Sequence, residues 1–267
     1  MRLRRRHMHD LENIAVEKGD GIGWVFLNRP EAFNALNLPM AKELYEAGHE
    51  MASDSGVRVV VVSGRGKAFF AGGDVKDMKA HMGSDKFLRD LAFYLHGFVS
   101  DIARMPKPVI AAVNGTAAGA GFSLAMACDL TLAAEGARFI MAYTGIGLVP
   151  DGGSTYFLPR LVGYKRAVEL ALLNRPLTAR EAMELGLVNV VLPEEGFLER
   201  VGQFASDLAK GPSRAFGDCK KLLRLGMMES LETQMEHERR MIMKHSLDPE
   251  FAEGVSAFAE KRRPRFP

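Results

Sequence analysis

Two glycine-rich segments, each closely following an apolar run, constrain the fold of this chain more than any other feature. The first run, VRVVVV at 57–62, is followed by FFAGGD at 69–74, and the second, VIAAV at 109–113, by NGTAAGAG at 114–121. Such apolar runs predict buried strands. Small residues at a strand-to-helix junction let backbone N–H groups approach a ligand without obstruction by side chains. Two such junctions can aim two N–H groups at one oxygen atom, which is how an oxyanion hole is built.

Length and charge exclude several classes of protein. The chain has 267 residues, enough for one sizeable domain and a smaller additional region. A domain of this size has a hydrophobic core large enough to be stable without disulfides or a structural metal. Its net charge of +2 argues against a nucleic-acid partner, which requires a concentrated basic face. The two cysteines, Cys128 and Cys219, lack metal-ligand spacing, so we expect reduced thiols, no metal and a cytoplasmic protein. No segment is apolar for long enough to predict a membrane span.

The order of predicted elements divides the chain near residues 210–212. Strands are expected at 14–17, 22–27, 57–63, 109–113, 129–133 and 188–192. Helices are expected at 39–51, 84–104, from about 119, at 161–173, 178–185, 194–210, 213–225 and 228–246. We therefore expect a basic disordered tail at 1–10, an α/β core domain at 11–210 and a helical oligomerisation region at 211–267.

The last predicted helices are rich in methionine. The residues concerned are Met227, Met228, Met235, Met241 and Met243. A methionine-rich helical face can line a ligand, but core or subunit packing is the commoner use. Because the helices after the main domain are too few to form a good core alone, the pattern favours an oligomer interface.

Four motifs in order carry a resemblance to a known family. They are LNRPEAFNAL at 27–36, AFFAGGD at 68–74, KPVIAAVNGTAAGAGFSLAMACDL at 107–130 and GLVPDGGST at 147–155. Over nearly its whole length the chain resembles the crotonase (enoyl-CoA hydratase/isomerase) superfamily. Two segments, FIMAYTGIGLVPDGGSTYFLPR at 139–160 and EGVSAFAEKRRPRF at 253–266, resemble most the phenylacetate-pathway branch of ring-epoxide and enoyl-CoA isomerases.

The resemblance implies a fold, a ligand and an assembly. The fold would be a crotonase-like superhelix of β-β-α turns with a C-terminal helical trimerisation region, assembled as a homotrimer or a dimer of trimers. The ligand would be an acyl-CoA thioester, so that coenzyme A enters as part of the substrate and no separate cofactor is needed. The oxyanion-hole N–H groups would belong to Gly73 and Ala120. The substrate-binding residues would be Ala32, Asn34, Ala35, Ala68, Ala71, Gly72, Asp74, Gly119, Phe122, Ser123, Tyr143 and Leu148, of which those in 32–35 and 68–74 lie near the adenine of CoA.

The chemistry of a thioester supports this interpretation. Its carbonyl becomes an enolate when a proton leaves the α-carbon, and two N–H donors stabilise that oxygen. Losing one such donor typically costs about 2.7–4 kcal/mol of barrier stabilisation. Ala120 is expected where a helix begins, and a helix N-terminus adds favourable partial charge. Taken alone, each glycine loop is more often a simple tight turn, and only the set of motifs favours an oxyanion hole. A dinucleotide-binding site is not predicted either, because GAGFSL at 119–124 lacks the third glycine of the G-x-G-x-x-G fingerprint.

The acid–base residues distinguish a hydratase from an isomerase. Hydratases of the family place two glutamates around a water, but the matching positions here are Ser123 and Tyr143. Neither side chain does the work of a carboxylate easily at neutral pH. Asp151 stands at the motif position where the related isomerases carry their catalytic aspartate. An aspartate before Gly-Gly and a helix is also a common N-cap, but the resemblance favours catalysis.

A single carboxylate suffices for a 1,3-proton shift. Asp151 would take the α-proton of a 3-enoyl thioester and return a proton at the γ-carbon, or assist rearrangement of a ring epoxide on phenylacetyl-CoA. Such a base works best in an apolar pocket. The expected walls are Phe122, Ala142, Tyr143, Ile146 and Leu148.

Other titratable residues near the motifs are weaker candidates. Asp74 is expected to fix its loop through backbone N–H groups, and Asp77 to lie on the face of the following helix. His81 and His96 fall in the segment around the acyl pocket, where a lone helical histidine is usually a surface or satisfied core residue.

Three other functions remain open on the sequence. One is a weak enoyl-CoA hydratase. Another is an aryl-CoA dehalogenase-like enzyme in which Asp151 attacks as a nucleophile, which would need His81 or His96 as a nearby base. The last is a non-catalytic acyl-CoA-binding protein, suggested by the loss of both glutamates.

Overall fold

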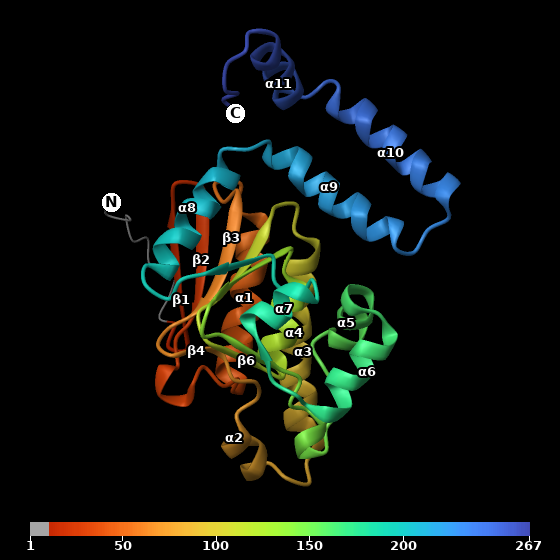
Figure 1. The fold of residues 1–267 in the computed structure, drawn as a ribbon. Coiled ribbons are helices and arrows are strands. Elements are labelled where there is room, and N and C mark those ends of the chain that lie inside the picture. The colour runs from red at the N-terminus through yellow and green to blue at the C-terminus, as the bar shows by residue number, and fades with distance from the viewer. Residues whose placement is uncertain (1–10) are drawn as a thin grey trace.

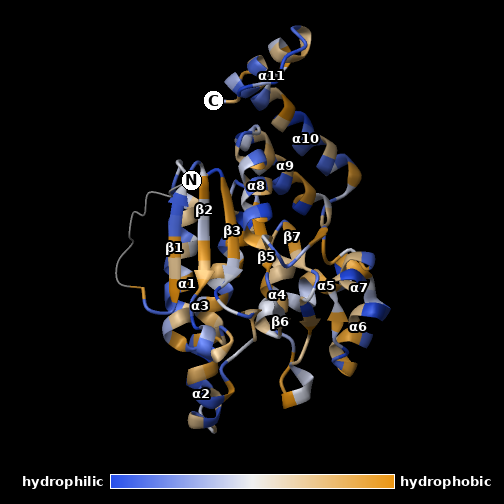
Figure 2. Ribbon diagram, turned by 60° about the vertical axis from the view of Figure 1, so that its left-hand side comes forward, coloured by the Kyte–Doolittle hydropathy of each residue, from blue (hydrophilic) through white to orange (hydrophobic). Residues whose placement is uncertain are grey.

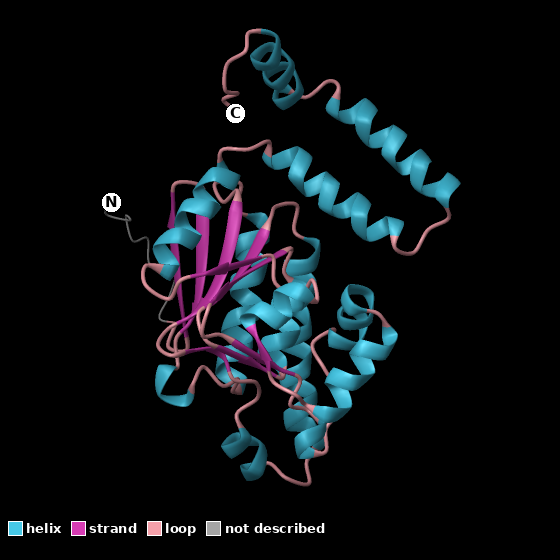
Figure 3. Cartoon of the chain, viewed as in Figure 1, coloured by secondary structure: helices cyan, strands magenta, loops and turns pink. Residues whose placement is uncertain are grey.

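The computed structural model describes residues 11–267, so the predicted basic tail at 1–10 lies outside the described residues. The chain builds a six-stranded main sheet in the order β1-β2-β3-β5-β7-β10 (Figures 1 and 3). Its strands are β1 Ile14–Gly19, β2 Ile22–Leu27, β3 Val59–Gly64, β5 Val109–Val113, β7 Leu130–Ala134 and β10 Val190–Leu192. β1 and β2 form the predicted hairpin, and the other neighbours pair in parallel. Asp20 and Gly21 both have positive φ, as a tight hairpin turn of this hand requires.

The main sheet is buried on both faces. Val60 and Val62 of β3 belong to a core shared with helices α1 (Leu38–Ser53), α3 (Asp85–Arg104) and α4 (Ala120–Ala127). Val59 and Val61 belong to a second core under α8 (Phe197–Ala209). A parallel strand with two covered faces reads as a continuous apolar run, which explains the valines of β3. The hydrophobic colouring along β2 and β3 in Figure 2 follows this arrangement.

A second, four-stranded sheet has the order β4-β6-β8-β9. Its strands are β4 Ala68–Phe70, β6 Thr116–Ala118, β8 Arg138–Ile140 and β9 Leu177–Thr178. β4, β6 and β8 each follow a main-sheet strand after a short turn, which produces the expected repetition of β-β-α units. None of these four strands was predicted, and the helix expected from Thr178 begins one residue later, after β9. Strands of two or three residues are too short to show a period-two pattern.

The helices between the sheets differ in part from the prediction. They are α2 Val75–Ala80, α5 Ser154–Val162, α6 Tyr164–Leu173 and α7 Ala179–Glu184, with 3-10 turns at Pro30–Ala32 and Thr144–Ile146. The single helix expected at 161–173 is wrong, because Gly163 at φ 76° separates α5 from α6. α5 was missed because it contains Pro159 and follows two glycines, both of which are ordinarily signals for a loop.

Three helices form the C-terminal region and project from the body (Figure 1). They are α9 Ser213–Gly226, α10 Leu231–His245 and α11 Pro249–Ala259. α10 begins three residues later than expected, at the N-cap Ser230, and α11 was not predicted. Met227, Met228, Met235 and Met243 are exposed, so core packing is wrong for these four, and subunit packing stays a prediction. No helix among residues 11–267 is long and apolar enough to cross a membrane.

Candidate active site

The two glycine loops come together at one edge of the second sheet. β4 and β6 are parallel neighbours, so the loops that leave their carboxyl ends meet. A Cβ built on Gly72 would lie 3.0 Å from the carbonyl oxygen of Ala118 and 3.7 Å from the Cα of Gly119. Gly72 and Gly119 also have φ values of 94° and 50°, a region that residues other than glycine rarely adopt. Glycine is therefore required here for close approach of the two backbones.

The two predicted oxyanion donors are left unused by the fold. Among residues 11–267, no backbone or side-chain acceptor receives the N–H of Gly73 or that of Ala120. Ala120 is the first residue of α4, where the helix N-terminus contributes positive partial charge. One residue further on, a Cβ at Gly121 would lie 2.0 Å from the carbonyl oxygen of Phe70, so α4 starts pressed against β4. This packing fixes the direction of the Ala120 N–H group.

The segment expected near the CoA adenine lies against the first glycine loop. Leu36 donates its N–H to Gly72 at 2.7 Å and accepts that of Asp74 at 2.9 Å. Arg29 pairs with Asp74 at 3.1 Å, and Asp74 caps α2 through the N–H groups of its first turn, as expected. Asn34 is fully buried and its amide bonds the carbonyls of three residues, Arg65, Ala68 and Phe69. Its side chain therefore holds the loop, while Ala32, Ala35 and Ala71 lie beside it at half-buried positions.

Ser123 and Tyr143, which the resemblance matches to the glutamate positions of hydratases, bond to each other. Their hydroxyl oxygens are 2.9 Å apart. Ser123 Oγ is also 3.2 Å from the carbonyl oxygen of Gly119, and Tyr143 Oη donates to that of Asp151 at 3.3 Å. Burial raises the pKa of Tyr143, so the ring stays a neutral phenol. The pair connects the second glycine loop to the backbone of Asp151.

Asp151 contacts His96, one of the two histidines that the sequence offered as weaker candidates. Nε2 of His96, on α3, contacts Oδ1 of Asp151 across 55 residues of sequence. Helix α5 is capped by Gly153 without a side-chain bond, so Asp151 is not the N-cap that its spacing allowed. His96 is a surface residue, as expected, with its side chain 52% exposed, but it is not without a partner. Its signal was the placement of His96, Ser100 and Arg104 at four-residue spacing on one face of an amphipathic helix.

The remaining predicted residues differ in their burial: some lie in the core behind the site and others at the surface. Phe122 is 1% exposed and packs against Phe139, so it belongs to the core behind the site. Ile146 is 56% exposed and does not form a wall, whereas Leu148 is half-buried and bonded through its N–H to the carbonyl of Tyr143. His81 stacks on Phe87 at 4.3 Å and ends α2. The apolar enclosure expected for Asp151 is thus incomplete in the single chain, where its side chain is 38% exposed.

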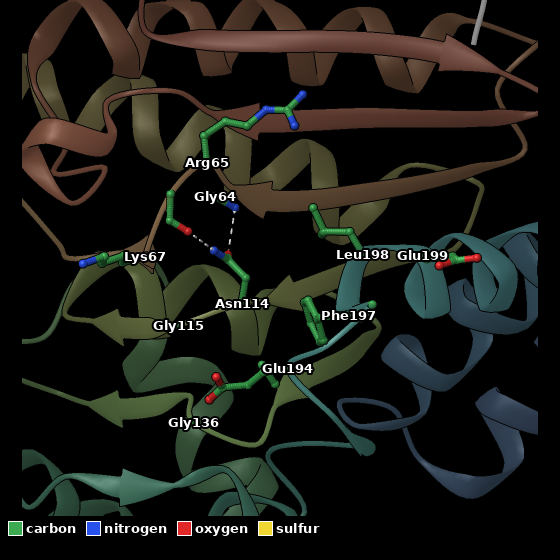
Figure 4. Close-up of a pocket in the computed structure, with 13 residues that line it drawn as sticks. Gly64, Arg65, Lys67, Asn114, Gly115, Gly136, Glu194, Phe197, Leu198 and Glu199 are labelled. Atoms are coloured by element: carbon green, nitrogen blue, oxygen red, sulfur yellow. Dashed lines mark hydrogen bonds between the residues drawn. The ribbon is translucent and has the colours of Figure 1, made fainter. Parts of the chain in front are cut away.

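Two large cavities lie near these elements. One, of about 870 Å³, begins at His96 and Gly153 and runs between α3, α5 and α9. The other, of about 660 Å³, lies at the carboxyl ends of the main-sheet strands, where Asn114 bonds Gly64 and Gly66 (Figure 4). None of the predicted site residues lines this second cavity. Among the described residues, no group of three or more His, Cys, Asp or Glu side chains is placed to hold a metal ion.

Comparison with known proteins gives a consistent set of relatives. Residues 17–267 match the family model described as Enoyl-CoA hydratase/isomerase. The chain is 38% identical to 4-chlorobenzoyl coenzyme A dehalogenase-2 of an Arthrobacter species, covering 93% of this chain and 91% of the relative. It is 38% identical to the 1,2-epoxyphenylacetyl-CoA isomerase of Escherichia coli, covering 94% and 96%. A Rhodobacter capsulatus protein named as a probable enoyl-CoA hydratase is 40% identical, covering 95% and 97%.

Solved structures agree with the fold. An enoyl-CoA hydratase from a Polaromonas species superposes with a TM-score of 0.91 at 33% identity, covering 95% of this chain and 99% of that one. An enoyl-CoA hydratase of Bacillus anthracis gives a TM-score of 0.90 at 32% identity, covering 96% and 99%. The predicted superhelix of β-β-α units followed by C-terminal helices is confirmed.

Proposed function

Because the chain belongs to the enoyl-CoA hydratase/isomerase family, whose substrates are acyl-CoA thioesters, we propose that it is an acyl-CoA isomerase. It would move a 3-enoyl double bond to the 2-position or rearrange a ring-epoxide phenylacetyl-CoA. The observation that carries this proposal is the composition of the site around the two free N–H groups. Asp151 supplies a carboxylate there, whereas Ser123 and Tyr143 bond each other where a hydratase needs two glutamates.

The mechanism follows from these groups. The N–H groups of Gly73 and Ala120 bind the thioester oxygen and stabilise the negative charge that develops on it. The Asp151 carboxylate takes a proton from the α-carbon, and the electron pair moves through the carbonyl to give a dienolate. Protonated Asp151 then returns the proton at the γ-carbon, which leaves the conjugated 2-enoyl thioester and the original carboxylate. His96 positions the carboxylate between the two carbons.

The substitution Asp151→Asn tests the role of the carboxylate. It keeps the shape of the side chain and removes its basicity, so we expect turnover of a 3-enoyl-CoA to fall roughly 10²–10⁴-fold. Binding of the substrate, measured by calorimetry, should stay within a few-fold. The matched control is Asp77→Asn on α2, a half-buried aspartate close in sequence to the first glycine loop. Full activity of the Asp151→Asn variant would remove this residue from the mechanism.

A second candidate function rests on the contact between His96 and Asp151. In a dehalogenase-like reaction the Asp151 carboxylate attacks the ring carbon of a halogenated aroyl-CoA, and the halide leaves with the electrons of its bond. Water activated by His96 then hydrolyses the resulting aryl ester. The relatives of Arthrobacter that are named as 4-chlorobenzoyl coenzyme A dehalogenases motivate this alternative.

One substrate panel separates the two reactions. Purified protein is given 3-enoyl-CoA, ring-epoxide phenylacetyl-CoA and 4-chlorobenzoyl-CoA, with product mass and chloride release as readouts. Isomerisation without chloride release supports the isomerase. Chloride release, with heavy oxygen from labelled water entering Asp151 in the first turnover, supports the dehalogenase. An absence of turnover with all three substrates favours the non-catalytic acyl-CoA-binding protein.

A further inference from the structure

A small cavity of about 160 Å³ lies between α5 and α6, behind the turn that carries Asp151 (Figure 1). Pro150 and Ser154, on either side of Asp151 in the chain, both line it, and its other walls are mostly apolar. Tyr156 and Phe157, on another face of α5, line the 870 Å³ cavity instead. The two cavities share no lining residue, so the small one is a separate cavity.

Among the described residues that line this small cavity, Ser154 alone has a buried polar side chain. The residue is fully buried, and within residues 11–267 its hydroxyl oxygen has no hydrogen-bond partner. Thr155 and Tyr164 are the other lining residues with polar side chains, and both are exposed. A buried hydroxyl without a partner is costly, because it has given up its hydrogen bonds to water. Ser154 therefore points to a ligand that supplies the missing bond.

The cavity suits a small organic molecule better than water. A buried water usually makes about three hydrogen bonds, whereas Ser154 is the one buried side chain of the lining that offers any. An apolar cavity of about 150 Å³ takes up benzene, so a single ring fits this volume. None of the lining residues described carries a charge, so an ionised ligand would lose its hydration without gaining a counter-charge. The favoured ligand is therefore an uncharged ring with one hydroxyl group.

We propose that this cavity binds a phenol-class molecule whose hydroxyl group bonds Ser154 Oγ. Hydroxyl groups both donate and accept, so either partner can supply the proton of that bond. At the rim, the exposed ring of Tyr164 offers a face or an edge to the ligand. The N–H of Ser154 donates to the Asp151 carbonyl at 3.2 Å, so the ligand contacts the turn of the candidate base without entering the cavity that begins at His96. The inference goes beyond the proposed function, because it needs no acyl-CoA chemistry.

The test compares phenol with toluene, a ring of similar size without the hydroxyl group. Ligand-detected NMR titration of the wild type should show binding of both and none of benzoate. Ser154→Ala should weaken the binding of phenol at least threefold relative to that of toluene. Its melting temperature without ligand should not fall, because no hydrogen bond within the fold is lost. Thr155→Val, which removes an exposed hydroxyl at the rim, is the matched control and should leave the ratio unchanged.

Two further measurements locate the ligand. Ala171→Leu adds bulk at a half-buried wall position on α6 and should weaken the binding of both rings at least tenfold. Saturating butyryl-CoA should leave phenol binding unchanged, because the two cavities share no lining residue. If Ala171→Leu does not fold, the comparison with Ser154→Ala decides alone.

The outcomes separate this inference from the proposed function. Phenol binding that depends on Ser154 supports the inference even if no thioester is isomerised. The inference is overturned if phenol does not bind, if Ser154→Ala affects both rings equally, or if Ala171→Leu changes nothing. Loss of phenol binding in the presence of butyryl-CoA also overturns it, since phenol would then occupy the larger cavity. Each of these results leaves the proposed function standing.

Discussion

Tyr143 and Ser123 connect the two halves of the site at the residue scale. Their hydroxyl pair joins the carbonyl of Gly119, beside the Ala120 donor, to the carbonyl of Asp151. A hydrogen bond of this kind is worth about 0.5–1.5 kcal/mol net, and here it also links the loop of Ala120 to the backbone of Asp151. Ala142, next to Tyr143, is held at φ 59°, an uncommon conformation for alanine that the surrounding fold must impose.

The variant Tyr143→Phe tests this connection. It removes one hydroxyl and leaves the ring, so we expect kcat to fall about tenfold while KM stays within twofold, because positioning acts in the transition state. Steady-state kinetics with 3-enoyl-CoA measure both. Tyr164→Phe, which alters a phenol that is 72% exposed, is the control. A raised KM with unchanged kcat would instead assign Tyr143 to substrate binding.

Gly121 gives a second prediction at this scale. A Cβ at Gly121 would lie 2.0 Å from the backbone oxygen of Phe70, and backbone cannot move aside as a side chain can. Gly121→Ala should lower the free energy of unfolding by about 1–3 kcal/mol, the usual cost of overpacking. Urea denaturation measures it. Gly202→Ala in α8, where the nearest atom is 3.6 Å away, should be neutral or stabilising by up to about 1 kcal/mol, and an equal loss in both variants would contradict this account.

At the scale of elements, ion pairs attach helix α9 to the body of the protein on one side and to α10 on the other. Lys220 fixes it to the body through Asp129, and Asp218 fixes it to α10 through Lys244 and His245. Burial opposes ionisation of Asp218, but the bonds from Lys244 and His245 hold its pKa below the usual range. Burial also disfavours the charged form of Lys220 and lowers its pKa, although the negative charge of Asp129 acts in the opposite direction. The α9 wall of the cavity that begins at His96 therefore depends on these ion pairs.

Acid should loosen this attachment. Because the pKa of Asp218 is depressed in the folded protein, its stabilising contribution is complete above the unfolded pKa near 3.9 and is lost as pH falls through the folded pKa. Asp218→Asn should lower the free energy of unfolding at pH 7 and flatten its pH dependence below about pH 4. Urea denaturation at pH 3–7 measures this, with Asp90→Asn, a partly exposed carboxylate on α3, as the control. The same slope in wild type and Asp218→Asn would exclude the role.

At the scale of the whole molecule, the C-terminal helices expose large apolar side chains. They include Leu231, Ile242, Leu247, Phe251 and Phe258, of which Leu247 and Phe258 are 88% and 87% exposed. Monomers rarely expose so many large apolar residues on one small region. Subunit packing of α9–α11 is the physical reason that we favour, as the sequence analysis also predicted.

Light scattering coupled to size exclusion tests the assembly. We expect a mass of three or six chains for the wild type, and a smaller species for Leu247→Ser/Phe258→Ser, because polar substitution removes apolar area from the interface. Leu88→Ser on α3, a partly exposed leucine outside α9–α11, is the control and should leave the mass unchanged. A monomeric wild type would contradict the prediction.

The sequence by itself determined the features that are local. The valines of β3, the hairpin turn at Asp20 and Gly21 and the long helices all follow from short-range patterns, and these elements were predicted. The glycine junctions at 69–74 and 114–121 indicated where two backbones approach closely, because only small residues permit it. The donor roles of Gly73 and Ala120, which the resemblance implies, stay a prediction. Asp151 was singled out by its motif, although its catalytic role stays a prediction.

Only the tertiary structure decided what depends on residues far apart in the chain. The second sheet escaped prediction because strands of two or three residues form through pairing with neighbours and not through their own pattern. His96 meets Asp151 across 55 residues, and Arg104 and Lys221 share one cavity although they lie on different helices. A side chain's partners are set by how elements pack, and packing is a property of the whole core. The sequence thus supplied the candidate oxyanion donors and the candidate carboxylate, while the fold showed that His96 contacts Asp151 and that a cavity begins at His96.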